Sequence, residues 1–321
     1  MSEIQPVSYL HATGQIQYNM TNDYMFRYIL QKNKKVLKGL VCSLLHLCPD
    51  DVISLEIVNP VNLSEDVQGK EFILDINVML NDNTSINLEM QVVNKHNWPE
   101  RSLSYLCRSY DNLYKGHEYE EVMPAIHIGF LDFTLFPEVP EFYATNMFMN
   151  VKNHHIFSDK MKLCVVDLSQ IELATEEDRE AGIDHWARLF KAKTWEEMKE
   201  LAKKDGYLQE AAQSLYEANA DVIVRQKCWA REEAERHERT VQRDMQRLKD
   251  KVDSLRGEYD NLKGENDSLN GEKDSLNGEN DSLKGENDSL KGENDSLKGE
   301  NDSLKEQLSI LQEQIQRLQN K

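Results

Sequence analysis

Two short runs in the first third of the chain carry polar side chains of the kind that bind metal ions. Residues 72–80 and 85–93 alternate apolar and polar side chains, and Asn-Asp-Asn-Thr separates them, a pattern typical of a β-hairpin. Asp75 lies on the polar face of the first strand, and Glu89 and Gln91 lie on that of the second. Pairing the two apolar faces also pairs the two polar faces. We therefore expect Asp75 beside Glu89 and Gln91.

The turn decides whether these side chains meet. For Asp75 to share a face with Glu89 and Gln91, the numbers of paired residues must sum to an even value, so the loop must contain an odd number of residues. A three-residue loop with Asn83 in the left-handed region would satisfy this condition. A regular two-residue turn would set Asp75 opposite Met90 instead.

Two carboxylates and an amide on neighbouring strands are typical of a divalent cation site. Like charges repel, and a hard cation with oxygen ligands removes the repulsion. Mg2+ commonly takes one or two carboxylates and completes its shell with water and substrate phosphate. The solvent-facing side of an ordinary antiparallel sheet is also polar, so the pattern alone leaves both interpretations open.

Short motifs follow one another between about residues 16 and 245. They are Asn22-Asp23-Tyr24-Met25-Phe26, Gly69-Lys70, Leu74-Asp75-Ile76, Asn87-Leu88-Glu89-Met90-Gln91, Gly116-His117-Glu118-Tyr119, Met123-Pro124, Ile126-His127-Ile128 and Leu131-Asp132-Phe133, with Arg101, Tyr105 and Tyr110 among them. In this order they resemble the PD-(D/E)XK nuclease superfamily and, within it, the recombination-promoting nuclease or putative transposase family of bacteria.

The resemblance implies a fold, an activity and a set of site residues. It implies a restriction-endonuclease-like α/β fold and Mg2+-dependent cleavage of DNA. Asp75, Glu89 and the Met90 carbonyl would bind the metal, and Gln91 would join the two carboxylates as a catalytic residue. Gln91 takes the place of the superfamily's lysine, and a glutamine holds water by hydrogen bonds but supplies no positive charge.

Helices are expected before and after the hairpin. Thr21-Asn22-Asp23 offers N-cap chemistry ahead of an apolar-periodic stretch, and a second helix carries Val36 to Leu45. Asp23 is expected to cap the first helix, and its place in the family pattern makes it an active-site neighbour.

A helix is also expected directly after the Glu89 strand, beginning at Pro99 and ending at Gly116. Its apolar stripe would be Leu103, Leu106, Tyr110 and Leu113. Arg101 and Arg108 lie on another side. Because the first turn should lie near the carboxylates, these arginines either contact phosphates or belong to an ordinary solvated face.

The remaining strands follow from apolar runs. Residues 52–58 are expected to form a strand, and the nearly continuous runs 125–131 and 163–168 predict strands buried on both faces. His154-His155 is expected to lie in a loop. The order of elements favours a mixed sheet flanked by helices.

The charge balance weighs against strong non-specific binding of nucleic acid. The formal net charge is −19, and residues 251–321 hold 10 Lys and Arg against 17 Asp and Glu, a net of −7 that leaves −12 for residues 1–250. A DNA-binding protein of this composition needs a local basic patch or a metal ion.

The cellular compartment is expected to be the cytoplasm. The five cysteines are scattered and form no CxxC pair, which suggests neither a disulfide framework nor a zinc site. No run has the apolar length of a membrane span, and no apolar leader with a positive charge opens the chain.

The end of the chain repeats with a period of seven residues. Eleven leucines recur from Leu248 to Leu318, and glycine occupies the most exposed heptad position seven times from Gly257 to Gly299. Asparagine recurs at the a position, and glutamates at g can meet lysines of a partner helix, which favours a parallel homodimeric coiled coil. A disordered acidic tail is the alternative.

These features predict three segments and two possible functions. Residues 1–206 would form the nuclease-like domain, 207–244 a helical connector that continues as one long helix, and 245–321 the coiled coil. The first function is a metal-dependent DNA endonuclease that acts in recombination or on mobile elements. The second is a catalytically inactive nuclease-like protein that works through its coiled coil.

Overall fold

The computed structural model describes residues 8–58, 76–113 and 116–319. The chain divides into two compact units, Met1–Val241, here called the body, and Gln242–Lys321, here called the tail. Asp75 lies outside the described residues, as do the Gly69-Lys70 motif and Leu74.

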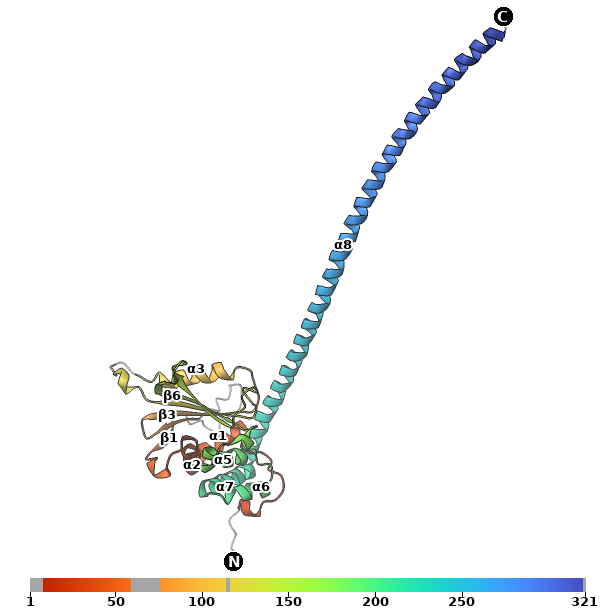
Figure 1. Cartoon of the computed structure of the whole chain (residues 1–321). Helices are drawn as coiled ribbons and strands as arrows, with labels where there is room; N and C mark the ends of the chain where they lie inside the picture. The colour runs from red at the N-terminus through yellow and green to blue at the C-terminus, as the bar shows by residue number, and fades with distance from the viewer. Residues whose placement is uncertain (1–7, 59–75, 114–115, 320–321) are drawn as a thin grey trace, which may run out of the picture. The chain divides into compact units, whose positions relative to one another are not determined.

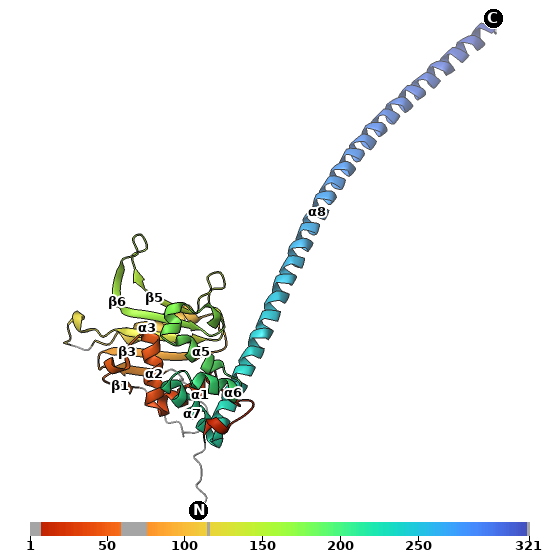
Figure 2. The same cartoon turned by 60° about the horizontal axis from the view of Figure 1, so that its bottom comes forward.

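A mixed sheet forms the centre of the body, as the sequence predicts, and within the described residues it has six strands, one more than the sequence predicts. Its strands are β1 (Leu55–Ile57), β2 (Ile76–Leu80), β3 (Thr84–Gln91), β4 (Ala125–Leu131), β5 (Tyr143–Met149) and β6 (Ile156–Asp167). They lie in the order β1-β2-β3-β4-β6-β5. The neighbours β3-β4 and β4-β6 are parallel, and the other neighbouring pairs are antiparallel. Figure 2 shows β5 and β6 side by side at one edge of the sheet.

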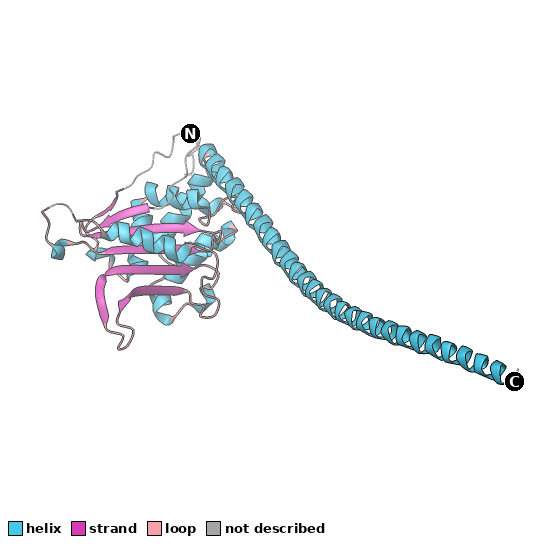
Figure 3. Ribbon diagram, turned by 90° about the horizontal axis from the view of Figure 1, so that it is seen from above, coloured by secondary structure: helices cyan, strands magenta, loops and turns pink. Residues whose placement is uncertain are grey.

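Helices cover both faces of this sheet (Figures 1 and 3). On one face lie α1 (Asp23–Lys32), α2 (Lys34–Leu45) and α5 (Ile183–Lys191), and on the other lies α3 (Trp98–Tyr110). The remaining helices are α4 (Glu176–Glu180), α6 (Trp195–Ala202), α7 (Gly206–Ala220), α8 (Val222–Gln319) and the short 3-10 turns η1 (Tyr9–His11), η2 (Pro49–Asp51), η3 (Tyr119–Glu121) and η4 (Ile171–Leu173).

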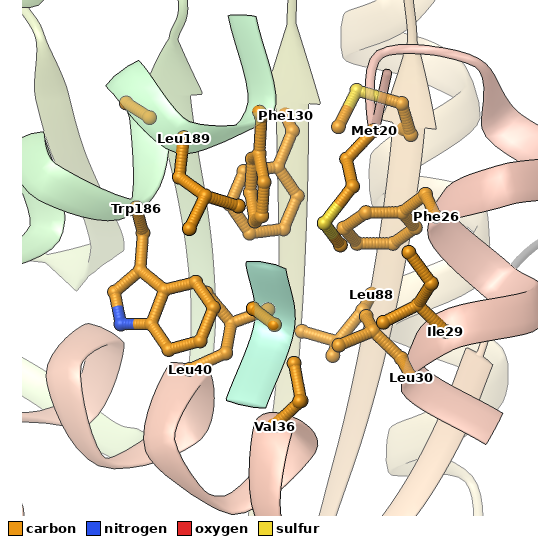
Figure 4. Close-up of a cluster of buried hydrophobic side chains, with 14 of the residues drawn as sticks. Met20, Phe26, Ile29, Leu30, Val36, Leu40, Leu88, Phe130, Trp186 and Leu189 are labelled. Atoms are coloured by element: carbon orange, nitrogen blue, oxygen red, sulfur yellow. The ribbon is translucent and has the colours of Figure 1, made fainter. Parts of the chain in front are cut away.

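The main hydrophobic core lies between the sheet and the α1, α2 and α5 side (Figure 4). Phe26 of α1, Phe130 of β4 and Phe190 of α5 meet there with ring centroids 5.3–5.6 Å apart, and two of the three pairs are edge-to-face. Such pairs add to the free energy gained by burying the rings. This core holds β3 and β4 rigidly from one side.

The β2–β3 hairpin confirms the predicted register. Ile76 pairs with Leu88 and Leu80 with Thr84, so each pair of residue numbers sums to the even value 164. The turn holds three residues, Asn81 to Asn83. The prediction for Asn83 is wrong, because Asn81 (φ 50°) and Asp82 (φ 56°) adopt the left-handed region instead.

The reason lies in the side chain of Asn81. Its Oδ1 accepts hydrogen bonds from the backbone N–H groups of Ile53 (2.8 Å) and Ser54 (3.2 Å). Its Nδ2 donates to the Asp51 carbonyl at 3.0 Å. The segment before β1 thereby fixes the first turn residue, and asparagine tolerates the left-handed conformation better than most residues.

The predicted single helix after residue 207 is interrupted. Asp221 ends α7 and begins α8, because its carboxylate accepts hydrogen bonds from the N–H groups of Ile223 (2.8 Å) and Val224 (3.2 Å). Helix α7 buries Leu208, Ala211, Ala212, Leu215 and Ala218 in the body.

The tail is helical throughout its described length, as part of α8. Its heptad leucines remain 52–73% exposed in the single chain. In the part of the chain that the structure describes, no helix carries an apolar stretch long enough to cross a membrane.

Candidate active site

A row of buried polar side chains follows the face of β3 that α3 covers. Asn87, Glu89 and Gln91 are only 4–7% exposed, whereas Ile86, Leu88 and Met90 point into the main core. The sequence predicts this division of faces correctly. The burial of this polar face is not predicted by the sequence. It results from α3, which covers the face.

Arg101 contacts two members of this row, Glu89 and Gln91. It lies in the first turn of α3, and its Nη2 is 2.6 Å from Oε1 of Glu89. Its Nη1 donates to Oε1 of Gln91 at 3.3 Å, and Gln91 Nε2 donates to the Val93 carbonyl at 2.8 Å. A positive charge therefore lies between a buried carboxylate and an amide oxygen.

His127 of β4 approaches the same carboxylate from the other side. Its Nε2 is 3.8 Å from Oε2 of Glu89, and the side chain is fully buried. The ring packs against Trp98 and Tyr105, with centroid distances of 5.4 and 6.0 Å. Burial, and secondarily the charge of Arg101, lower the pKa of His127 to about 4, so the imidazole is neutral at pH 7.

Gly129 makes this packing possible. A Cβ at this position would lie 2.0 Å from Cζ2 of Trp98, so the indole occupies the space of the missing side chain. In the β3–β4 ladder Glu89 pairs with Gly129 and Asn87 pairs with His127. The absence of a side chain on Gly129 thus lets Trp98 pack against β4 and against the His127 ring.

A comparison with known protein families identifies the family of the chain. Residues 20–246 match the family model of PD-(D/E)XK nuclease family transposases. The chain belongs to this family. Nucleases of the PD-(D/E)XK type generally use divalent metals. No curated protein and no solved structure matches the chain in the corresponding comparisons.

The donor set of this family member fits a divalent cation. Glu89 offers a carboxylate, Gln91 an amide oxygen and Met90 a main-chain carbonyl, all of them hard oxygen donors. The guanidinium beside Glu89 shows that the site accepts a positive charge. Within the described ranges, which do not include Asp75, no three His, Cys, Asp or Glu side chains are arranged so that they could together hold a metal ion. Water or phosphate oxygens would therefore complete the shell.

Helix α3 differs from its prediction in phase and in length. It begins at Trp98 and ends at Tyr110, so Gly116 does not cap it. Its buried residues are Trp98, Ser102 and Leu106, whereas Leu103 is 45% exposed. The insertion of Trp98 against Gly129 sets this phase, and it turns Arg101 towards Glu89.

Of two other predicted residues, one has surroundings that differ from those expected. Arg108 is exposed, with no ion-pair partner among the residues that the structure describes, and this exposure is compatible with either a phosphate contact or a solvated helix face. Asp23 is not the helix cap, because Asn22 accepts the hydrogen bond from Met25 N–H. The Asp23 carboxylate instead accepts hydrogen bonds from Arg231 of α8, with Nε 2.9 Å from Oδ1.

Sequence reasoning missed the roles of His127 and Trp98 in the wall of this site. One signal was available for His127, which is the single charged or strongly polar residue in the apolar run Ala125–Leu131. A polar side chain on a strand buried on both faces needs a partner across the sheet. No comparable local signal links Trp98 to Gly129.

Proposed function

We propose that the chain is a Mg2+-dependent DNA endonuclease that hydrolyses phosphodiester bonds. One observation carries this proposal. The buried Glu89 carboxylate lies against a cationic group and beside Gln91, on a strand fixed from both faces. Membership of a PD-(D/E)XK nuclease family supports the same conclusion.

The proposed metal ligands are Asp75, Glu89 and the Met90 carbonyl. Asp75 lies outside the described residues, so the support comes from the hairpin beside it. The observed pairs have residue numbers that sum to 164, and the same sum would pair Asp75 with Glu89. Two carboxylates and a carbonyl are a ligand set suited to Mg2+, with water and phosphate in the remaining positions.

The chain's own residues would divide the chemistry between them. Mg2+, when bound by these residues, would supply Lewis-acid stabilisation of charge on the phosphate and would make water a stronger acid. Gln91 would orient the attacking water through its side-chain amide. Arg101 would exchange its bond with Glu89 for a phosphate oxygen of the scissile strand. Arg108, exposed on the same helix, is proposed as a second phosphate contact.

DNA binding by an acidic protein must be local. Residues 1–250 have a net charge of −12, so long-range attraction to DNA is absent. The cation and the two arginines of α3 would supply the positive charge at the cleavage point, with Asp23 as a neighbour on α1.

The setting follows from the family and from the tail. We propose action on mobile elements or in recombination, in the cytoplasm, by a parallel homodimer that pairs through the tail. Cutting both strands of a duplex requires two active sites, and a dimer provides them.

A plasmid cleavage assay tests this function. The wild-type chain should nick or linearise supercoiled DNA with Mg2+ or Mn2+ and should not do so in EDTA. Asp75→Ala and Glu89→Ala should each abolish cleavage, and Gln91→Ala should weaken it less because a water molecule finds other hydrogen-bond partners. Glu177→Ala, which changes an exposed glutamate on α4, is the matched control and should cut normally.

The acidic body favours one alternative, a catalytically inactive nuclease-like protein that works through its coiled coil. Wild-type protein that cuts no nucleic acid with either metal would support this alternative. So would an Asp75→Ala variant that still cuts, because the observed activity would then not belong to this site.

A further inference from the structure

His127 is a buried polar group of the site that the proposed cleavage chemistry does not use. It is fully buried in β4, with Nε2 3.8 Å from Oε2 of Glu89. Neither of its ring nitrogens has a hydrogen-bond partner among the described residues. We propose that His127 is a positioning residue that orients the Glu89 carboxylate for binding a divalent cation, an inference that rests on the proposed function.

The two oxygens of Glu89 have different neighbours. Oε1 lies 2.6 Å from Arg101, on the side where positive charge is held, and Oε2 faces His127. An N–H at Nε2 needs to move only about 0.8 Å closer to reach an ordinary hydrogen-bond length. A hydrogen bond to Oε2 would fix rotation of the carboxylate and leave Oε1 directed at the cation.

The imidazole is held firmly enough to perform this task. Trp98 and Tyr105 pack against it, and Trp98 is in turn seated in the space left by Gly129. The main chain of β4 is fixed by parallel pairing with β3 on one side and β6 on the other. The direction of Nε2 towards Glu89 therefore follows from packing on three sides.

The same burial separates a positioning role from a catalytic one. A side chain with no exposed surface does not touch DNA or the attacking water. A buried polar group without a hydrogen bond is also costly to the fold, and an aliphatic residue of similar size would be more favourable there. Stability alone gives no reason for histidine at this position.

Metal affinity measured without DNA tests the proposal in the full-length chain. Titration calorimetry with Mn2+ and with Mg2+ would compare wild type, His127→Leu and His127→Gln. Leucine removes the donor and should weaken metal binding at least about tenfold, as loss of a group that orients a metal ligand usually does. Glutamine places a donor near the position of Nε2 and should retain most of the affinity. Without metal, His127→Leu should melt at the same temperature as wild type or higher.

Two outcomes overturn the proposal while leaving the nuclease assignment intact. The first is a His127→Leu variant that binds metal as tightly as wild type. The second is an equal loss of affinity in both variants, which would indicate packing alone. Wild-type protein without metal affinity would overturn the proposed function as well.

A measurement on the wild-type fold covers the case in which His127→Leu does not fold. In protein labelled with 15N-histidine, the Nε2 resonance of His127 should shift on addition of Mg2+, and Glu89→Gln should remove this shift. A resonance that is insensitive to Mg2+ while calorimetry detects binding would overturn the proposal.

Discussion

At the scale of single residues, the ion pair between Glu89 and Arg101 neutralises a buried carboxylate of the candidate site. The carboxylate is 5% exposed, and a buried carboxylate is stable only with hydrogen bonds and positive charge beside it. The guanidinium supplies both at 2.6 Å. It also lies at the oxygen that the proposed metal ion would bind, so on the proposed function Arg101 and the cation would compete for Glu89.

Arg101→Ala should therefore change stability in a metal-dependent way. Without metal, loss of the ion pair should lower the free energy of unfolding by about 1–3 kcal/mol, because the carboxylate loses a charged hydrogen-bond donor. With Mg2+ the variant should recover, and its melting temperature should rise more than that of wild type because no guanidinium competes. Thermal unfolding in EDTA and in Mg2+ measures both effects.

Arg108→Ala is the matched control for this experiment. It removes an exposed arginine of the same helix. It should change neither the melting temperature in EDTA nor the rise in melting temperature on addition of Mg2+. The Arg101→Ala protein should keep neither the wild-type melting temperature in EDTA nor the wild-type rise in Mg2+. Wild-type values for both would show that the Arg101 guanidinium and Mg2+ do not compete for Glu89.

At the scale of elements, the first turns of α8 are bound to the body by a cluster of charged side chains. Arg231 binds Asp23 at the start of α1, and Glu238 lies 2.8 Å from Lys95, in the segment that follows β3. Glu235 lies between them, largely buried, with Arg239 3.6 Å away. Helix α8 is thus tied to two elements next to the candidate site.

This cluster should make stability depend on pH. Burial, with the Asp23 carboxylate second, raises the pKa of Glu235 from 4.5 to about 7. Between these values the folded body holds a proton that the unfolded chain releases, so the free energy of unfolding falls as pH rises. Glu235→Gln removes the penalty and should stabilise the body by about 1–2 kcal/mol at pH 8, with little effect near pH 4.5.

Thermal unfolding at the two pH values measures this effect, and Glu233→Gln provides the comparison. Glu233 lies on the same helix with a 45% exposed side chain. A Glu235→Gln variant with no more stability than wild type at pH 8 would show that Glu235 is adequately solvated or paired in its charged form.

Residue patterns within single elements predicted much of this arrangement. Period-two alternation located β2, β3 and their shared polar face, because the backbone of a strand alone dictates that alternation. Apolar runs located β4 and part of β6 for the same reason. Strand β5 was missed, because its residues are mostly exposed and show no apolar face.

Contacts between distant segments were beyond the reach of such patterns. Arg231 lies 208 positions from Asp23, and the fit of Trp98 against Gly129 depends on the whole sheet and α3 together. Those contacts decided the phase of α3, the partner of Asp23 and the burial of Glu89. The placement of Asp75 remains a prediction from the hairpin register.

At the scale of the whole molecule, the tail carries an apolar stripe that a single chain leaves in water. Its leucines recur every seven residues and are 52–73% exposed. Within one chain, Lys284 and Lys305 lie near aspartates three positions earlier in the helix, at 3.4 and 3.1 Å. Such exposed ion pairs contribute little to the stability of a single helix. Burial of the leucine stripe against a partner helix would contribute much more.

Deleting residues 246–321 should therefore convert a dimer into a monomer without unfolding the body. The cut falls after Val241, where the body ends, and after Glu238, which pairs with Lys95. Sedimentation should give a dimer for the full chain and a monomer for the truncation, with the melting of the body retained.

Replacing Gly278, Gly285 and Gly292 by alanine is the converse test. Their missing Cβ positions face open space in the single chain, and each substitution should favour the helix by about 1 kcal/mol. The substituted dimer should melt at a higher temperature and dissociate at a lower concentration than wild type. An unchanged mass ratio between full chain and truncation would show either that the body dimerises by itself or that the tail does not pair.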